Sequence, residues 1–156
     1  MPIEIIEYRP AFAKAFKELN LSWIEKYFRV EEPDIEALSK PEKYIIESGG
    51  SIYFALEGEQ VVGTCALVRK DQTTFELAKM AVQESHQGKH IGEKLGRAVI
   101  AKAKAQGATA VILETNKILT PAVRLYEKLG FVPAQRPSDD PPSRYERSNL
   151  YMRLDL

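Results

Sequence analysis

Residues 86–92 read H-Q-G-K-H-I-G and place two glycines, two histidines and a lysine directly ahead of a helical pattern. The first amides of a helix have no intrahelical acceptor and carry part of the helix dipole, so they attract anions. Glycines let a phosphate approach such a backbone without meeting a Cβ atom. The segment therefore predicts a phosphate-binding turn, although an ordinary strand-to-helix turn could carry the same residues.

Other chemistry at this segment has less support. It matches neither G-x-G-x-x-G nor G-x-x-x-x-G-K-[ST], which removes the main evidence for a dinucleotide fold or a P-loop. His86 and His90 are spaced as metal ligands can be, but the sequence offers no convincing third ligand. We therefore expect no metal site, and two histidines that flank a surface turn.

The surrounding elements must position this turn between a strand and a helix. Strands are predicted at residues 3–8, 74–82, 110–114 and 150–156, with a hairpin over 51–68 that turns at 57–60. Helices are predicted at residues 10–27, 34–47, 91–106 and 120–129, the last with an N-cap oxygen from Thr120 and a first-turn proline at Pro121. The order β-α-α-β-β-β-α-β-α-β-β predicts a mixed α/β sheet with helices on its faces.

Composition narrows the functional classes. The 156 residues carry 22 Lys and Arg against 22 Asp and Glu, so no overall field attracts nucleic acid or an anionic membrane. No stretch approaches the roughly 20 apolar residues of a membrane span. Cys65 is the one cysteine and lies in an apolar run, which favours a buried thiol over a nucleophile. We expect one domain, no membrane partner and a cytoplasmic location.

Two longer segments carry a family resemblance. The stretch L-A-K-M-A-V-Q-E-S-H-Q-G-K-H-I-G-E-K-L, followed further along by P-A-V-R-L-Y-E-K-L-G-F, resembles the GNAT superfamily of acetyl-CoA-dependent N-acetyltransferases. The resemblance covers residues 74–131. It implies a single domain over residues 1–156, with a mixed, mostly antiparallel twisted sheet, flanking helices and a splayed central strand pair.

The resemblance also implies how acetyl-CoA is held. The family turn [QR]-x-x-G-x-[GA] holds pyrophosphate with backbone amides, and the preceding strand pairs with the pantetheine arm through its main chain. One of those strand amides would polarise the thioester carbonyl. The implied cofactor contacts are Met80, Ala81, Val82, Gln87, Gly88, Lys89, His90, Ile91, Gly92, Glu93, Asn116, Tyr126 and Lys128.

Two positions depart from the family pattern. His90 replaces the usual middle glycine, and a side chain at a positive φ would cost about 1 to 2 kcal/mol. Leu119 stands where many relatives have an asparagine that contacts the cofactor or orders the helix. Leucine cannot supply that hydrogen bond, so Asn116 is the candidate replacement.

Transfer of an acetyl group to an amine poses two proton problems. An alkylammonium with a pKa of about 10.4 must lose a proton before it can attack, and the leaving thiolate gains from receiving one. By resemblance, Tyr126 is the acid; the alternative is an ordinary core tyrosine. Glu76 matches a family position that acts as a base, directly or through water; the alternative is a solvated carboxylate.

The acceptor is less defined by the sequence. By resemblance, Trp23, Tyr27, Phe28, Glu31 and Tyr145 would line the acceptor site, although the aromatic residues could equally belong to the core. The acidic residues at 31, 32 and 34 would attract a cationic amine, or form a solvated loop.

The resemblance thus predicts an N-acetyltransferase that passes acetyl directly to a primary amine of a small molecule or peptide. The alternative is a non-catalytic acyl-CoA-binding sensor or interaction module. A nucleic-acid module, suggested by the lysines of helix 91–106, is disfavoured by the zero net charge. Exposed sheet edges make a homodimer a further expectation.

Overall fold

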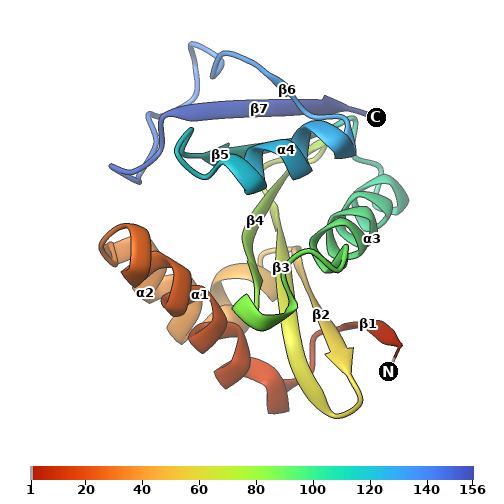
Figure 1. Cartoon of the computed structure of the whole chain (residues 1–156). Coiled ribbons are helices and arrows are strands. Elements are labelled where there is room, and N and C mark those ends of the chain that lie inside the picture. Colours follow the sequence, from red (N-terminus) through yellow and green to blue (C-terminus); the bar gives the residue numbers. More distant parts are fainter. Residues whose placement is uncertain (1) are drawn as a thin grey trace.

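The computed structural model describes residues 2–156, which form one seven-stranded sheet in the order β1-β2-β3-β4-β5-β7-β6 (Figure 1). Neighbouring strands are antiparallel except β4 and β5, which are parallel, so the predicted mixed and mostly antiparallel sheet is confirmed. The strands are β1 (Ile3–Glu7), β2 (Ser51–Glu57), β3 (Gln60–Arg69), β4 (Thr74–Val82), β5 (Ala110–Thr115), β6 (Val132–Pro133) and β7 (Leu150–Asp155).

Helices cover both faces of the sheet and bury two apolar clusters. The helices are α1 (Ala13–Tyr27), α2 (Glu32–Ser39), α3 (Ile91–Ala105) and α4 (Thr120–Leu129). Figure 1 shows α1 and α2 on one side of strands β2 to β4 and α3 on the other. Phe16 and Ile24 of α1 pack with Phe54, whereas Leu95 of α3 packs with Phe75 on the opposite face.

The two central strands separate part-way along their length. β4 pairs with β5 only from Thr74 to Glu76, and its later residues pair with β3 alone. The pairing of β3 with β4 shifts register near Cys65, and Lys79 opposite this shift has a φ of 52°. A bulge of this kind adds a residue to one strand and bends it. The predicted splayed pair is therefore present, and the bulge at Lys79 bends β4 within its diverging half.

Two local predictions were wrong. The helix predicted over 34–47 is instead α2 followed by a separate short π-helical turn, Glu42–Ile46. Pro41 lies between them and has no amide to donate, which ends α2 early. In α4, Thr120 is the first helical residue and Leu119 is the N-cap, with no side-chain hydrogen bond to the helix.

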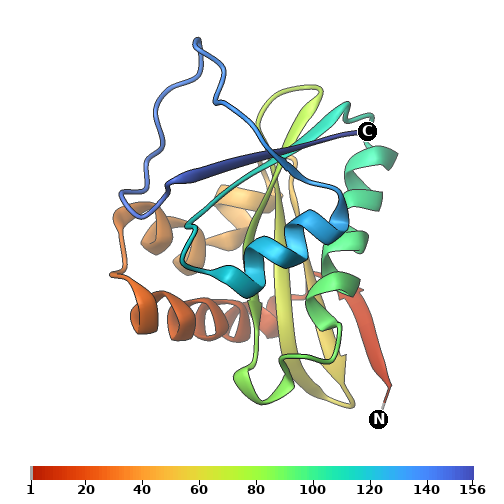
Figure 2. The ribbon, with the colours of Figure 1, turned by 45° about the horizontal axis from the view of Figure 1, so that its top comes forward.

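A long loop connects β6 to β7 and arches away from the sheet before it returns (Figure 2). Its ends are fixed by backbone bonds from Ala134 N to Tyr151 O and from Asn149 N to Thr115 O. The prolines in this loop remove donors and restrict the preceding residues, so no regular element forms. The loop thereby brings residues near 145 over the sheet.

Candidate active site

A cleft of about 1150 Å³ lies where β4 separates from β5. It extends from α1 and α2 across the strand gap to the start of α3, and the β6–β7 loop borders it as well. Met80 and Val82 of β4 line it. Ala81 and Lys89 do not line it, and the cofactor contacts predicted for them stay predictions.

The N-terminus of α3 faces the cleft with unpaired amides. The first helical bond runs from Lys94 N to His90 O at 3.2 Å, which leaves the amides of residues 91–93 without a helical acceptor. Gly88 has a φ of 84°, and a Cβ there would meet nothing within 4 Å. This open, amide-lined turn has the geometry that a pyrophosphate needs, so the residues fit coenzyme A.

His90 adopts the left-handed backbone conformation that the sequence analysis associated with a cost. Its φ is 62° and its ψ is 18°, at the N-cap of α3. The side chain is largely exposed, with Nδ1 3.7 Å from Glu93 Oε1. The chain therefore holds a strained histidine where glycine is the low-energy choice.

Gly92 lines the cleft and also has a packing role between two helices. A Cβ on Gly92 would lie 2.9 Å from Leu125 Cδ2, and a Cβ on Gly96 would lie 2.5 Å from Leu129 Cδ1. Both glycines therefore allow α3 and α4 to approach closely. A bulky residue at Gly92 would first disrupt helix packing rather than fill the phosphate turn.

Two predicted cofactor residues are linked to each other. Lys128 Nζ lies 2.9 Å from Glu93 Oε1, and Arg97 Nη2 lies 2.9 Å from Glu93 Oε2. Hydrogen bonds from Lys128 and Arg97 lower the pKa of Glu93. The carboxylate thus joins α3 to α4 and neutralises part of the positive charge beside the turn.

Tyr126 is buried on α4 and borders the cleft. Its ring packs edge-on against Phe131 with centroids 6.2 Å apart. Within residues 2–156, no group hydrogen bonds to its hydroxyl. Burial raises the pKa of Tyr126, as does the neighbouring Cys65 thiol, so the phenol is protonated at neutral pH.

Glu76 lies on the opposite face of the sheet from Tyr126. It pairs in register with Val68, which packs against the cluster under α1 and α2, whereas Tyr126 belongs to the cluster under α3 and α4. Its side chain is only 16% exposed, so Glu76 is not a solvated carboxylate. Burial raises its pKa, while Lys70, Lys79 and Arg136 oppose that shift.

A buried ion network that the sequence analysis missed lies beside the cleft. Asp34 Oδ1 contacts Lys79 Nζ at 2.5 Å and Arg147 Nη2 at 2.7 Å, and Glu31 Oε2 contacts Arg147 Nη1 at 3.2 Å. Burial would raise the pKa of Asp34, but hydrogen bonds from Arg147 and the charge of Lys79 lower it to about 2. Of the acidic cluster predicted as an amine attractor or a solvated loop, Glu31 and Asp34 are therefore buried and paired with cations, whereas Glu32 is exposed.

Glu31 accordingly does not border the cleft. Its side chain accepts a bond from the α2 backbone while Asp34 Oδ2 accepts one from Glu31 N at 3.0 Å, which forms a capping box. The spacing of two acidic residues at the start of a helix was a visible signal for this role. Glu31 thus caps α2 and pairs with Arg147, and the cleft lining lends no support to the acceptor contact predicted for it.

The predicted aromatic residues do come together at the cleft. Trp23, Tyr27, Phe28 and Tyr145 all line it. Two cations lie close to the Tyr145 ring, with Lys79 Nζ 4.7 Å and Arg147 Cζ 4.5 Å from its centroid. Tyr27 is half exposed, so the aromatic wall is partly open to solvent.

Asn116 borders the cleft but its amide serves the loop. Nδ2 donates to Arg147 O at 2.8 Å, and Oδ1 accepts from Ile118 N at 2.9 Å. Leu119 also lines the cleft. The cofactor contact predicted for Asn116 stays a prediction and would use its remaining N–H.

Further polar residues were missed because their strands and loops gave no motif. Glu114 of β5 lines the cleft with Arg136, and the two side chains are in contact. Lys70 lines it from the β3–β4 connection. Cys65 is fully buried as expected, and burial raises the pKa of its thiol.

Two features of residues 2–156 bear on metal binding and membrane insertion. In that part of the chain, no group of three His, Cys, Asp or Glu residues is arranged to hold a metal ion. The same residues contain no helix long and apolar enough to cross a membrane.

Comparison with known proteins identifies the family. Residues 14–131 match the model of the acetyltransferase (GNAT) family. The chain belongs to this family. A zebrafish protein named N-acetylaspartate synthetase is 35% identical over 116 residues, which are 74% of this chain and 39% of that protein. The chain thus spans about two fifths of the length of this relative.

Solved structures of the GNAT family share the whole fold. A GNAT acetyltransferase from Staphylococcus aureus Mu50 is 28% identical, has a TM-score of 0.89 and covers 99% of both chains. A GNAT acetyltransferase from Elizabethkingia anophelis, solved with acetyl-CoA bound, is 23% identical with a TM-score of 0.72, over 99% of this chain and 98% of its own. The latter likeness establishes the fold alone.

Proposed function

We propose that this GNAT protein is an acetyl-CoA-dependent N-acetyltransferase that transfers acetyl directly to a primary amine. One observation carries the proposal: Glu76 and Tyr126 border the same cleft from opposite faces of the sheet, at the gap between β4 and β5. An amine arriving on the α1–α2 face meets the carboxylate. A thioester reaching the gap from the α3 turn meets the phenol.

Each side chain then has one proton to move. Acetyl-CoA supplies the acetyl thioester, whose carbon–sulfur bond breaks as the carbon–nitrogen bond forms. Glu76 takes a proton from the acceptor ammonium, directly or through water, and Tyr126 gives one to the departing sulfur. The nitrogen loses its second proton as the amide forms, and that proton restores the Tyr126 phenol. The free amides of residues 91–93 hold the pyrophosphate of acetyl-CoA. The part of β4 that has no pairing with β5 positions the pantetheine arm.

Binding and turnover test this proposal separately. Calorimetric titration of the wild type and of a His90→Glu variant measures how much the turn contributes to acetyl-CoA affinity. A carboxylate at the start of the helix should repel the phosphates. We expect affinity to fall at least about tenfold in the variant. A Lys14→Glu variant on exposed α1 controls for net charge. Equal affinity in all three proteins would contradict a pyrophosphate site at α3.

A non-catalytic acyl-CoA sensor is the second candidate. It is favoured by the strained His90 and by the apolar N-cap Leu119, both of which sit at the cofactor end of the cleft. Release of coenzyme A thiol with a broad amine panel distinguishes the two. Tight binding without acceptor-dependent release would support the sensor.

Location and assembly are further parts of the proposal. The single buried thiol of Cys65 and the lack of any disulfide partner for it support a reducing, cytoplasmic setting. The edge strands β1 and β6 support a homodimer through sheet pairing. Sedimentation equilibrium would test the dimer, and a monomer at micromolar concentration would contradict it.

A further inference from the structure

At the acceptor end of the cleft, four side chains of the sheet form the floor. Glu76 of β4 is in register with Ile112 of β5, and Glu114 lies two residues further along β5, opposite Tyr151 of β7. Paired residues share a face of the sheet, and so do alternate residues of a strand. These four side chains therefore project to the α1–α2 face, and all four line the cleft.

Each floor carboxylate is accompanied by a cation. Lys70 Nζ lies 3.7 Å from Glu76 Oε1, and Arg136 contacts Glu114, which also accepts a bond from Ser143 Oγ at 3.1 Å. The acceptor end thus alternates in sign instead of being acidic. A polyamine would meet repulsion from both cations, and an apolar amine would desolvate them without compensation.

Lys70 is the cation that lies beside Glu76, and it has spare donors. Its contact with Glu76 exceeds hydrogen-bond length, and within residues 2–156 its ammonium makes no hydrogen bond. Its side chain is 46% exposed and borders the cleft. Lys79 and Arg147, by contrast, are 7% and 13% exposed and are engaged by Asp34. Lys70 is therefore available to an anionic group of an acceptor whose amine lies at Glu76.

We propose that the acceptor is a small free amino acid, whose amine meets Glu76 while its carboxylate pairs with Lys70. The inference rests on the proposed acetyltransferase function and specifies the acceptor of that same site. In an α-amino acid the nitrogen and a carboxylate oxygen lie about 3 Å apart. This separation matches the 3.7 Å between the charged atoms of Glu76 and Lys70, so two opposite pairs form side by side.

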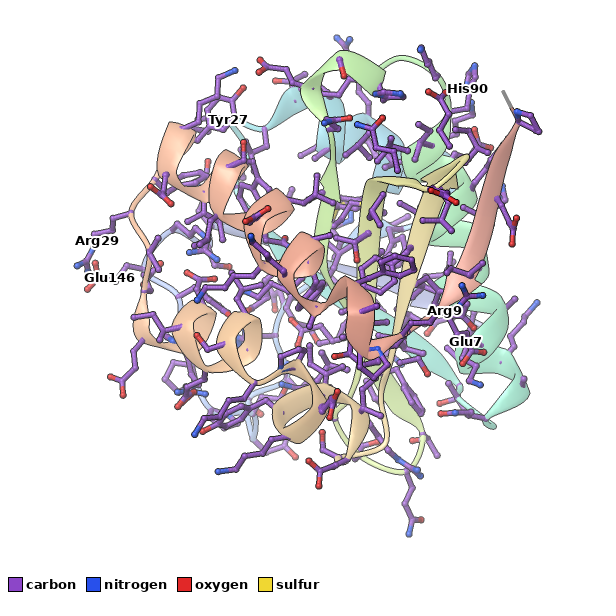
Figure 3. All side chains as sticks on the ribbon, turned by 90° about the horizontal axis from the view of Figure 1, so that it is seen from below. Glu7, Arg9, Tyr27, Arg29, His90 and Glu146 are labelled. Carbon is purple, nitrogen blue, oxygen red and sulfur yellow. The ribbon has the colours of Figure 1, made fainter. Side chains whose placement is uncertain are left out.

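The β6–β7 loop favours a free small molecule over a residue of a folded protein. Arg147 fixes the end of this loop to Asp34 with Nη1 and Nη2 both 2.7 Å from the carboxylate oxygens. Outside this buried pair, Arg29 Nη2 lies 2.6 Å from Glu146 Oε2, and Figure 3 shows the two side by side at the edge of the molecule. The loop thus spans the acceptor end and limits its width.

Matched acceptors test the inference on the full chain. Each of the common amino acids is assayed with acetyl-CoA by thiol release, beside its carboxamide and its decarboxylated amine. For the best amino acid we expect kcat/KM to fall about 10- to 100-fold when the carboxylate is removed, since a charged hydrogen bond is lost. Lysine-containing peptides represent a protein acceptor in the same assay. We expect their kcat/KM to be lower than that of the free amino acid.

Variants of Lys70 then test whether this side chain binds the carboxylate of the acceptor. Lys70→Met should raise KM for the amino acid about 10- to 100-fold while leaving KM for the decarboxylated amine nearly unchanged. Lys70→Arg should restore most of the preference, and Lys14→Met on exposed α1 should leave it intact. The comparison of two acceptors removes any effect of Lys70 on the Glu76 base, because that effect acts on both.

The outcomes separate the two proposals. Equal turnover of the amino acid and its decarboxylated amine, or a preference for the peptides, would overturn the amino-acid acceptor and leave the acetyltransferase intact. A parallel loss for both acceptors in Lys70→Met would also overturn it. If acetyl-CoA binds but no amine of any class releases thiol, the catalytic proposal fails and the acceptor inference with it.

Discussion

Lys79 Nζ lies 2.5 Å from Asp34 Oδ1, and this buried ion pair joins the bulge of β4 to helix α2. Lys79 has a positive φ, so its side chain leaves the strand at a point where the regular pleat is broken. The pair therefore couples the part of β4 that diverges from β5 to the helices that border the acceptor. We infer that the width of the cleft depends on this contact.

Removal of Asp34 should destabilise the protein strongly. In Asp34→Ala, two cations, Lys79 and Arg147, remain largely buried without their main counter-ion. Breaking one side of a buried ion pair costs about 3 to 5 kcal/mol. Urea denaturation should show this loss, whereas Glu32→Gln on the exposed part of the same helix should change the free energy of unfolding by less than about 0.5 kcal/mol.

The same carboxylate predicts how stability depends on pH. The pKa of Asp34 falls from its ordinary value of 3.8 to about 2 in the folded protein, so its contribution is fully present above pH 4. That contribution is lost as the pH falls through the folded pKa. Denaturation midpoints measured between pH 5 and about 2 should therefore drop in the wild type. An Asp34→Asn variant that shows the same drop would contradict this assignment.

His90 should be a site where glycine is stabilising. Because its φ is 62°, His90→Gly relieves about 1 kcal/mol of backbone strain, less the extra entropy of glycine in the unfolded chain. We expect a small rise in thermal unfolding temperature. Lys89→Gly is the matched control, since the positive-φ residues other than glycine among residues 2–156 are Lys79 and His90. Glycine at Lys89 should lower the thermal unfolding temperature. If both variants unfold at a lower temperature than the wild type, the backbone at His90 is not strained.

The strands and helices of the fold could be predicted from the sequence, because local residue patterns mark them. Strand β4 was predicted at its observed bounds, since Pro-free alternation and a following glycine turn mark it. The network of Asp34, Lys79 and Arg147 was not reachable in this way, because its members are far apart in sequence and meet only through a bulge and a long loop. Glu114 was missed for the same reason, since its role depends on which strand lies beside it.

Tyr126→Phe should separate chemistry from binding. The substitution keeps the ring against Phe131 and removes the hydroxyl, which makes no hydrogen bond within residues 2–156. If the phenol protonates the leaving sulfur, kcat should fall about 100-fold while the dissociation constant of acetyl-CoA stays within twofold. Stopped-flow thiol release and calorimetry provide the two values, and an unchanged kcat would remove Tyr126 from the acid role.

Glu76→Gln should abolish the acid limb of the pH–rate profile. Burial raises the pKa of Glu76 above its ordinary 4.5, and a base must be ionised to accept a proton, so wild-type kcat should fall as the pH drops through this raised pKa. The glutamine variant should lose about 100-fold in kcat near neutral pH and show no such limb. Glu59→Gln, in the exposed β2–β3 turn, should keep both the rate and the limb. If the Glu76 variant retains the limb, the base lies elsewhere in the cleft, and Glu114, on the same face of the sheet, becomes the carboxylate to substitute next.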